Sequence, residues 1–431
     1  MKKLNWHSIA GRDSSWRREW LAGCTMFSAM LYIVLLNPVL LAQSGMDFSG
    51  AYMATVLSAA VASFLMGWLA DYPIAAAPGI GLNAYFVYSV VLSQGYSWQE
   101  AMGSVFLASV LFLVLAATPF FHAFLEAVPQ SLKMAIMGGV GILAALLGLI
   151  RGKLIVGSPA SVTMLGDLSE PTAFLTLLGL LVTAVLSANR VQSALLAGMG
   201  VVLAAGLLLG FVVLPPEMFS WPQGLDRTAG QLAFSFRGGM PLILLVMFLL
   251  LVFHTTGILL GVGSQTKIPE GTSADMQKRF RAAALGSLLG SLLGGGLVTG
   301  SVESAAGTGS GGRTGMAAIL TAGLFLLLLF CTPLAKAIAG MAAITAPALI
   351  FTGFFMASGI RDIDWQDISE GVPAFLTMAV MPLSYDILAG IGTGVVSYVL
   401  LKLFSGKGRE VKPLLYILAV LFAFQLGSST W

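Results

Sequence analysis

The chain has 431 residues, of which 57% are hydrophobic and only 10% are charged, with a formal net charge of +3 at pH 7. Globular proteins carry about 25% charged residues, so this composition excludes a soluble enzyme and a disordered chain. No basic block is long enough to follow a phosphate backbone, which excludes a nucleic-acid partner. We therefore expect a protein that is surrounded by a lipid bilayer.

The N-terminal segment is polar and basic. It contains Lys2, Lys3, Arg12, Arg17 and Arg18, and no short apolar core with a cleavage site precedes the first long apolar run. We expect no removable signal peptide. Because cytoplasmic loops carry an excess of Lys and Arg, the N-terminus is expected in the cytoplasm and the protein in the plasma (inner) membrane.

Apolar runs of the length that crosses a bilayer as a helix, about 20 residues, follow one another along the chain. They cover about 20–43, 49–70, 99–121, 131–150, 171–188 and 193–214, and then about 239–262, 281–297, 314–333, 337–357, 371–384 and 386–404. A last run at 413–427 is short for a span, which leaves its place in the membrane open.

Two stretches rich in glycine, proline and small polar residues interrupt this pattern, at 73–93 and 298–313. Counted as broken spans, they bring the total to fourteen, and each is the third span of its half. Backbone without helical hydrogen bonds cannot face lipid but can line a cavity. Broken helices at matching positions indicate a transport site, and a short extended piece in each would allow the two to pair near the midplane.

Short similar segments recur in the same order in the two halves. Asp167-Leu-Ser-Glu170 is echoed by Asp367-Ile-Ser-Glu370, and Leu196-Ala-Gly-Met-Gly200 by Leu388-Ala-Gly-Ile-Gly392. An odd number of spans per copy places the second copy upside down, and inverted repeats are typical of secondary transporters. The predicted fold is an all-α polytopic membrane protein with 14 spans arranged as 7+7 inverted repeats.

Polar residues within the apolar runs are the candidates for function. Glu303 lies deep between two spans, and an ionisable group inside a membrane is a functional hypothesis by default; the alternative is a structural carboxyl paired with Arg313. His254 alone would more often be structural, but beside Glu303 it could bind a polar ring and hold a proton. Asn83 carries an amide that either contacts a ligand or makes a packing hydrogen bond. The two cysteines, Cys24 and Cys331, are too few for a metal cluster, and no cofactor is expected.

A resemblance to the azaguanine-type purine permeases rests on five motifs. They are Asn37-Pro-Val-Leu-Leu, Ala77-Pro-Gly-Ile-Gly-Leu-Asn83-Ala-Tyr-Phe, Glu303-Ser-Ala-Ala-Gly, Gly312-Arg-Thr-Gly315 and Asp367-Ile-Ser-Glu-Gly-Val-Pro-Ala-Phe-Leu-Thr377. These hypoxanthine, guanine and adenine permeases form a branch of the nucleobase:cation symporter-2 (nucleobase–ascorbate transporter) family. The resemblance implies a core domain of spans 1–4 and 8–11 that moves as an elevator against a gate domain of spans 5–7 and 12–14. The expected boundaries are 1–19 for the cytoplasmic segment, 20–121 and 239–333 for the core, 129–214 and 337–404 for the gate, and 405–431 for the C-terminal segment.

The same resemblance implies a substrate site between short strands of spans 3 and 10. Its span-10 acid matches Glu303, and its span-8 acid falls at His254, where the branch usually reads Asp-Thr-Thr-Gly and this sequence reads His254-Thr-Thr-Gly257. The expected substrate-binding residues are His254, Glu303, Asn83, Thr255, Ala77, Gly79, Val302 and Ser304. Glu303 and His254 are also expected to couple transport to a proton.

We thus expect proton-coupled uptake of a purine nucleobase of the adenine, guanine, hypoxanthine or xanthine class, by a chain that could form a homodimer. Because His254 replaces the usual acid, a different planar or anionic solute, such as urate or a pyrimidine, is the first alternative. A channel or a non-transporting membrane receptor is the second. An enzyme is the least expected, since no catalytic set and no ATP-binding motif is readable.

Overall fold

A computed structural model describes residues 14–118, 121–158, 163–191, 193–265 and 272–428. Of the basic N-terminal residues, Lys2, Lys3 and Arg12 lie outside this described part. Within it the chain is mostly helical, and eight helices are long and apolar enough to cross a membrane, or nine if one bent pair counts as a span.

The long apolar helices follow the predicted runs closely. They are α2 (Trp16–Ala42), α3 (Phe48–Ala70), α5 (Trp98–Ala117), α7 (Gln130–Arg151), α8 (Pro171–Ala188), α10 (Met240–Gln265), α15 (Ala342–Ala357) and α17 (Ile387–Phe404). The other described α-helices of eight residues or more are α9 (Ala194–Leu208), α11 (Ser273–Leu293), α13 (Gly315–Leu327), α14 (Thr332–Ala339), α16 (Ile368–Ser384) and α18 (Pro413–Ser428).

The predicted run 314–333 corresponds to a helix that ends just before Thr332 and Pro333, and a separate short helix follows. The helix that includes α13 ends at Phe330, and α14 follows at an angle of 83°. Pro333 lies in the first turn of α14, where a missing N–H costs nothing, whereas inside a continuous helix it would remove a hydrogen bond. The predicted span 337–357 accordingly begins later, because α14 continues to Ala339 and α15 starts at Ala342.

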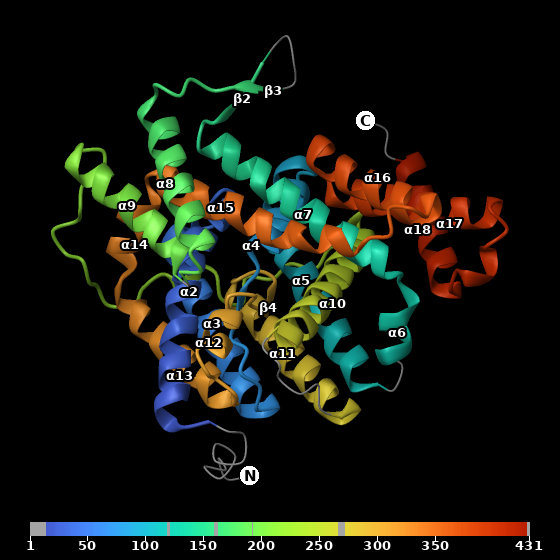
Figure 1. Ribbon diagram of the computed structural model, residues 1–431, viewed down its shortest axis with the longest axis horizontal. Coiled ribbons are helices and arrows are strands. Elements are labelled where there is room, and N and C mark those ends of the chain that lie inside the picture. Colours follow the sequence, from blue (N-terminus) through green and yellow to red (C-terminus); the bar gives the residue numbers. More distant parts are fainter. Residues whose placement is uncertain (1–13, 119–120, 159–162, 192, 266–271, 429–431) are drawn as a thin grey trace.

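Strands β1 (Ala76–Pro78) and β4 (Val298–Gly300) lie inside the two broken stretches and pair antiparallel, with Ala77 opposite Thr299. A short helix follows each strand: α4 (Ile80–Ala84), which continues as a π-helix over Tyr85–Ser93, and α12 (Ser304–Gly309). Figure 1 shows this strand pair in the middle of the molecule, surrounded by helices. A second hairpin, β2 (Ile155–Gly157) with β3 (Thr163–Leu165), projects from the edge of the molecule and was not predicted.

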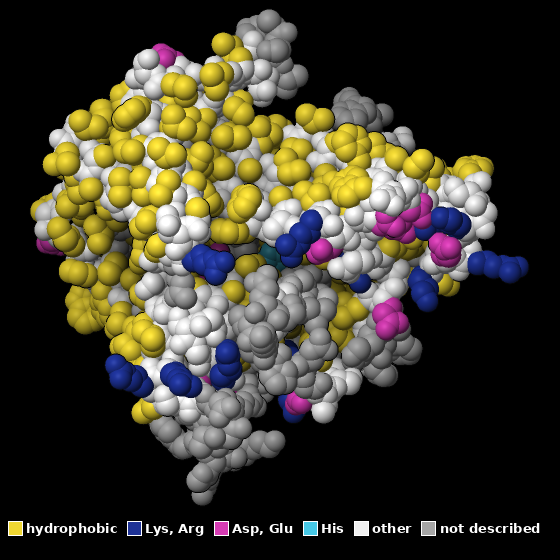
Figure 2. All heavy atoms as spheres, viewed as in Figure 1, with side chains coloured by type: hydrophobic (Ala, Val, Ile, Leu, Met, Phe, Trp, Pro, Cys, Tyr) yellow, Lys and Arg dark blue, Asp and Glu magenta, His cyan; other side chains and the backbone are white. Residues whose placement is uncertain are grey.

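Two groups of helices surround the strand pair. In the first, α3 packs against α2, α11 and α13; in the second, α7 packs against α15 and α16. Small residues allow the close approaches, as is usual between helices in membranes: a Cβ at Gly315 would overlap the backbone of Gly67 in α3. Figure 2 shows hydrophobic side chains over most of one face, with charged side chains gathered toward its lower and right parts. So large an apolar surface fits a chain that is surrounded by lipid.

Candidate functional site

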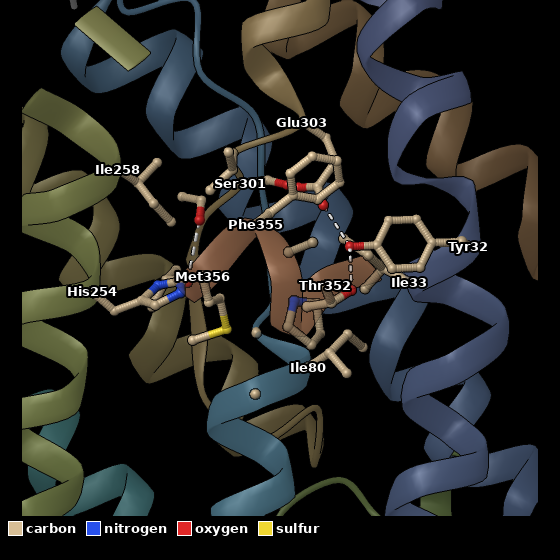
Figure 3. A pocket seen from close by; sticks show the side chains of 17 residues that line it. Tyr32, Ile33, Ile80, His254, Ile258, Ser301, Glu303, Thr352, Phe355 and Met356 are labelled. Carbon is tan, nitrogen blue, oxygen red and sulfur yellow. Dashed lines mark hydrogen bonds between the residues drawn. The ribbon is translucent and has the colours of Figure 1, made fainter. Parts of the chain in front are cut away.

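A cavity of about 50 Å³ lies beside β1 and β4, between α2, α10 and α15. Its polar lining consists of Tyr32, His254, Thr299, Ser301, Glu303 and Thr352. Figure 3 shows His254 and Tyr32 on opposite sides of this space, on α10 and α2, with Glu303 and Thr352 between them. Donors and acceptors from four separate parts of the chain therefore converge on one small volume.

Glu303 immediately precedes α12 and is only partly buried. The hydroxyl of Tyr32 donates to one of its carboxylate oxygens, and the hydroxyl of Ser301 donates to the other. The hydroxyl of Thr352, on α15, donates in turn to the Tyr32 oxygen at 3.3 Å (Figure 3). The carboxylate is thus linked through one tyrosine to a helix of the second group.

Arg313 does not take the structural role that was the alternative for Glu303. Its guanidinium donates to the backbone carbonyls of Thr308 and Gly312, at 2.8 and 3.1 Å. The hydrogen bonds found for the Glu303 carboxylate come from the hydroxyls of Tyr32 and Ser301, and no salt bridge to it is found among the described residues.

His254 is 9% exposed, and its Nδ1 lies 3.1 Å from the hydroxyl oxygen of Thr299 on β4. That hydroxyl donates to the Gly300 carbonyl, so its oxygen can accept from an Nδ1–H. In this tautomer the other ring nitrogen, Nε2, is an acceptor. A neutral histidine held in this way offers the same kind of hydrogen-bonding group as a carboxylate, without the charge.

Five of the eight predicted substrate-binding residues line the cavity: Ala77, Gly79, His254, Val302 and Glu303. The other three do not line it. Asn83 is fully buried and bonds to Asn37, and Ser304 is fully buried and bonds to Ala75. Thr255 is also fully buried, and its hydroxyl has no hydrogen-bond partner among the described residues.

Several lining residues were missed by the sequence analysis. Tyr32 and Thr352 are a tyrosine and a threonine inside apolar runs, where such residues most often serve packing, and they lie 271 and 49 residues from Glu303 along the chain. Phe355 and Met356 also line the cavity, from the same helix as Thr352. The one signal in the sequence that could have singled out Tyr32 is its hydroxyl, which is a polar group within an apolar run.

The cavity is small compared with typical ligand pockets. Its volume of about 50 Å³ compares with roughly 30 Å³ for one water molecule and with about 300–1,000 Å³ for typical ligand pockets. Phe355 and Met356 on α15 form part of its wall. These two side chains separate the strands from the rest of α15.

The sequence pattern of a permease family matches residues 17–393. The chain belongs to this family. The guanine/hypoxanthine permease PbuO of Bacillus subtilis is 36% identical to this permease, over 96% of this chain and 98% of its own. The adenine permease AdeP of Escherichia coli is 34% identical, over 95% and 92%. The resemblance to purine permeases that the motifs predicted is thereby confirmed.

Solved structures show the fold of the permease. The transmembrane domain of the cyanobacterial bicarbonate transporter BicA has a TM-score of 0.65 and 16% identity, covering 88% of this chain and 97% of that one. Membership of a permease family, together with its long apolar helices, makes this chain a multi-pass membrane transporter.

Proposed function

We propose that this permease takes up a purine nucleobase together with a proton. The observation that carries the proposal is the convergence of Glu303, His254 and the ends of two paired strands on one cavity. The names of its relatives, which include guanine/hypoxanthine and adenine permeases, support the same class of substrate.

A purine presents ring N–H donors and lone-pair acceptors at the edges of a flat, apolar ring. Glu303 would accept from one ring N–H, and Nε2 of His254 would accept from another edge. Backbone groups of Ala77–Gly79 and of Val302–Ser304 would complete the recognition. Phe355 would pack against the ring in an offset-stacked or edge-to-face arrangement, which aromatic rings prefer. With the proton on Nδ1, facing Thr299, Nε2 of His254 would accept a hydrogen bond as the span-8 acid of the branch does.

The proton would bind at Glu303. A carboxylate in a small cavity is costly unless it is neutralised or hydrogen-bonded, and here Tyr32 and Ser301 donate to it. Arrival of a proton would remove the charge and one acceptor, which changes both the affinity for the base and the bond to Tyr32. This gives the acid a part in binding as well as in coupling.

Transport would follow from a movement of the first helix group, with the strands, against α15 and its neighbours. Support comes from the position of the cavity, whose wall includes residues of both groups. The finer architecture belongs to the same proposal: fourteen spans in two inverted copies, core and gate domains, an elevator mechanism, and an N-terminus on the cytoplasmic side of the plasma membrane.

The test is uptake of labelled adenine, guanine, hypoxanthine and xanthine by cells without their own purine transporters. The wild type should show saturable uptake that depends on external pH, and Glu303→Gln should lose at least about tenfold in efficiency together with the pH dependence. Glu217→Gln, which removes an exposed loop carboxylate, is the matched control and should resemble the wild type. Normal pH-sensitive uptake by Glu303→Gln would remove the coupling role, and a wild type that takes up no purine would remove the function.

A second candidate is uptake of an anionic ring such as urate. It is favoured by the presence of an imidazole, which can become cationic, at the cavity position where the branch usually has an acid. Competition by urate, pyrimidines and purines, measured on the wild type and on His254→Asp, separates the two. Loss of urate competition with retained purine competition in His254→Asp would favour this second candidate.

A further inference from the structure

We propose that Asn83 and Ser304 are a reciprocal pair of positioning residues. Asn83, in the first broken span, binds the residue just before β4, and Ser304, in the second, binds the residue just before β1. The two fastenings hold the strand pair in register and so fix where Glu303 and the strand backbone lie. The transport part of this inference rests on the proposed function, whereas the fastening itself does not.

Asn83, on α4, reaches across to the approach of β4. Its Oδ1 accepts from the backbone N–H of Leu297 at 2.7 Å, and its amide donates to the Gly295 carbonyl at 3.2 Å. The amide also donates to Oδ1 of Asn37 at 2.7 Å, which fixes its orientation. Gly296 between the two contacts has a φ of +82°, and a Cβ there would collide with the Asn83 side chain.

Ser304, the first residue of α12, makes the corresponding contact with the approach of β1. Its hydroxyl accepts from the backbone N–H of Ala75 at 3.0 Å and lies 3.2 Å from the carbonyl oxygen of the same residue. Ser304 directly follows Glu303 in the chain. Its position therefore sets the position of the acid.

The backbone repeats the same symmetry. Gly79, just after β1, donates to the carbonyl of Leu297 at 2.9 Å, and Ser301, just after β4, donates to the carbonyl of Ala75 at 2.9 Å. Leu297 and Ala75, which each precede a strand, are thus held in the same way. The carbonyl of each accepts from a backbone N–H of the other broken span, and the N–H of each donates to a side chain of that span. Leu297 and Ala75 are fully buried.

This arrangement answers a physical need of the strands. Each is only three residues long, and an isolated two-stranded hairpin is at best marginally stable. A buried N–H without an acceptor is costly, so the loss of either side chain loosens the opposite span. A misplacement of about 1 Å in a binding site can reduce activity by roughly a hundredfold, so the transport effect should exceed that of an ordinary buried hydroxyl.

The test combines hydrogen exchange with uptake, on the full-length protein. In Asn83→Ala, amide exchange should rise at least about tenfold within residues 295–301, on the other broken span, and in Ser304→Ala it should rise within residues 72–79. Uptake of labelled purine should lose about ten- to hundredfold in efficiency, mainly through a higher KM. Thr308→Ala is the matched control, because this buried hydroxyl of α12 bonds to the carbonyls of Ser304 and Ala305 in the same half-helix.

Two further variants keep the test decisive if an alanine variant does not fold. Ser304→Thr keeps the hydroxyl, so amide exchange within residues 72–79 should stay close to that of the wild type. Asn83→Asp keeps an acceptor for the Leu297 N–H, so exchange within residues 295–301 should rise less than in Asn83→Ala. Exchange that rises only in the span carrying the substitution, or equally in Thr308→Ala, would overturn the inference. If the wild type transports no purine but the crossed exchange pattern is found, the fastening stands and the proposed function fails.

Discussion

The hydroxyl of Tyr32 is the point where the acid of the site meets the second helix group, and Tyr32→Phe removes it without changing the ring. Tyr32 is 2% exposed, donates to Glu303 and accepts from Thr352. We predict that Tyr32→Phe weakens purine uptake strongly, that Thr352→Val weakens it mildly, and that the double variant is no worse than Tyr32→Phe.

The magnitudes follow from the kinds of bond. A hydrogen bond to a charged group contributes about 1.5–3 kcal/mol, which corresponds to roughly ten- to hundredfold in affinity. The bond from Thr352 to Tyr32 joins two neutral groups at 3.3 Å, so its loss costs about 0.5–1.5 kcal/mol, or about two- to tenfold. The single hydroxyl hydrogen of Thr352 is shared with the Ala348 carbonyl at 2.8 Å, which places the loss on removing this hydroxyl at the lower end of that range.

The assay is the concentration dependence of labelled-purine uptake, with the amount of protein in the membrane measured for each variant. Tyr85→Phe is the matched control, because the Tyr85 hydroxyl is fully buried and has no hydrogen-bond partner among the described residues. Its removal should leave uptake close to that of the wild type.

Additive losses in the double variant would refute the reasoning, since the Thr352 bond cannot be lost twice. A loss in Tyr85→Phe as large as in Tyr32→Phe would also refute it, because the effect would then belong to any buried tyrosine hydroxyl.

Two further predictions concern stability, measured as the unfolding temperature in detergent. Gly315→Ala places a methyl group against the backbone of α3 and should lower the free energy of unfolding by about 2–3 kcal/mol. Gly309→Ala is the control, because no heavy atom is found within 4 Å of the added carbon, and it should not destabilise the protein. Equal losses of stability in the two variants would contradict this packing. Lys402→Met removes a side chain that is 4% exposed and whose Nζ lies 2.9 Å from a carboxylate oxygen of Glu370. Its loss should lower the free energy of unfolding by about 2 kcal/mol. Lys407→Met removes a lysine that is 43% exposed and should change the stability little. A larger effect at Lys407 would contradict the role of burial.

The regions that build the site could be predicted because their composition is unusual for a membrane helix. Pro78 and a run of glycines mark one broken stretch, and Glu303 stands out because charged residues are so scarce in the apolar runs. Strands β1 and β4 lie inside the two stretches. The same scarcity led to His254, which lines the cavity opposite Tyr32.

The direction of individual side chains could not be predicted. Asn83 belongs to a helix of five residues next to a strand, so no periodicity tells which face is buried, and its amide turns to the other broken span instead of the cavity. Thr352 lies in a helix whose approach to α2 depends on contacts between residues 320 positions apart. The short helix α14 was also not predicted, because a proline such as Pro333 marks the end of one helix without telling whether another begins there.

Counterflow by the purified permease in liposomes tests the central claim most directly. Liposomes loaded with unlabelled purine are diluted into a trace of the labelled base, so that only a carrier with a saturable site can exchange the two. The account predicts rapid, transient accumulation of label by the wild type and strongly reduced accumulation by Glu303→Gln. Label that enters no faster than into protein-free liposomes, for every purine tried, would contradict the account.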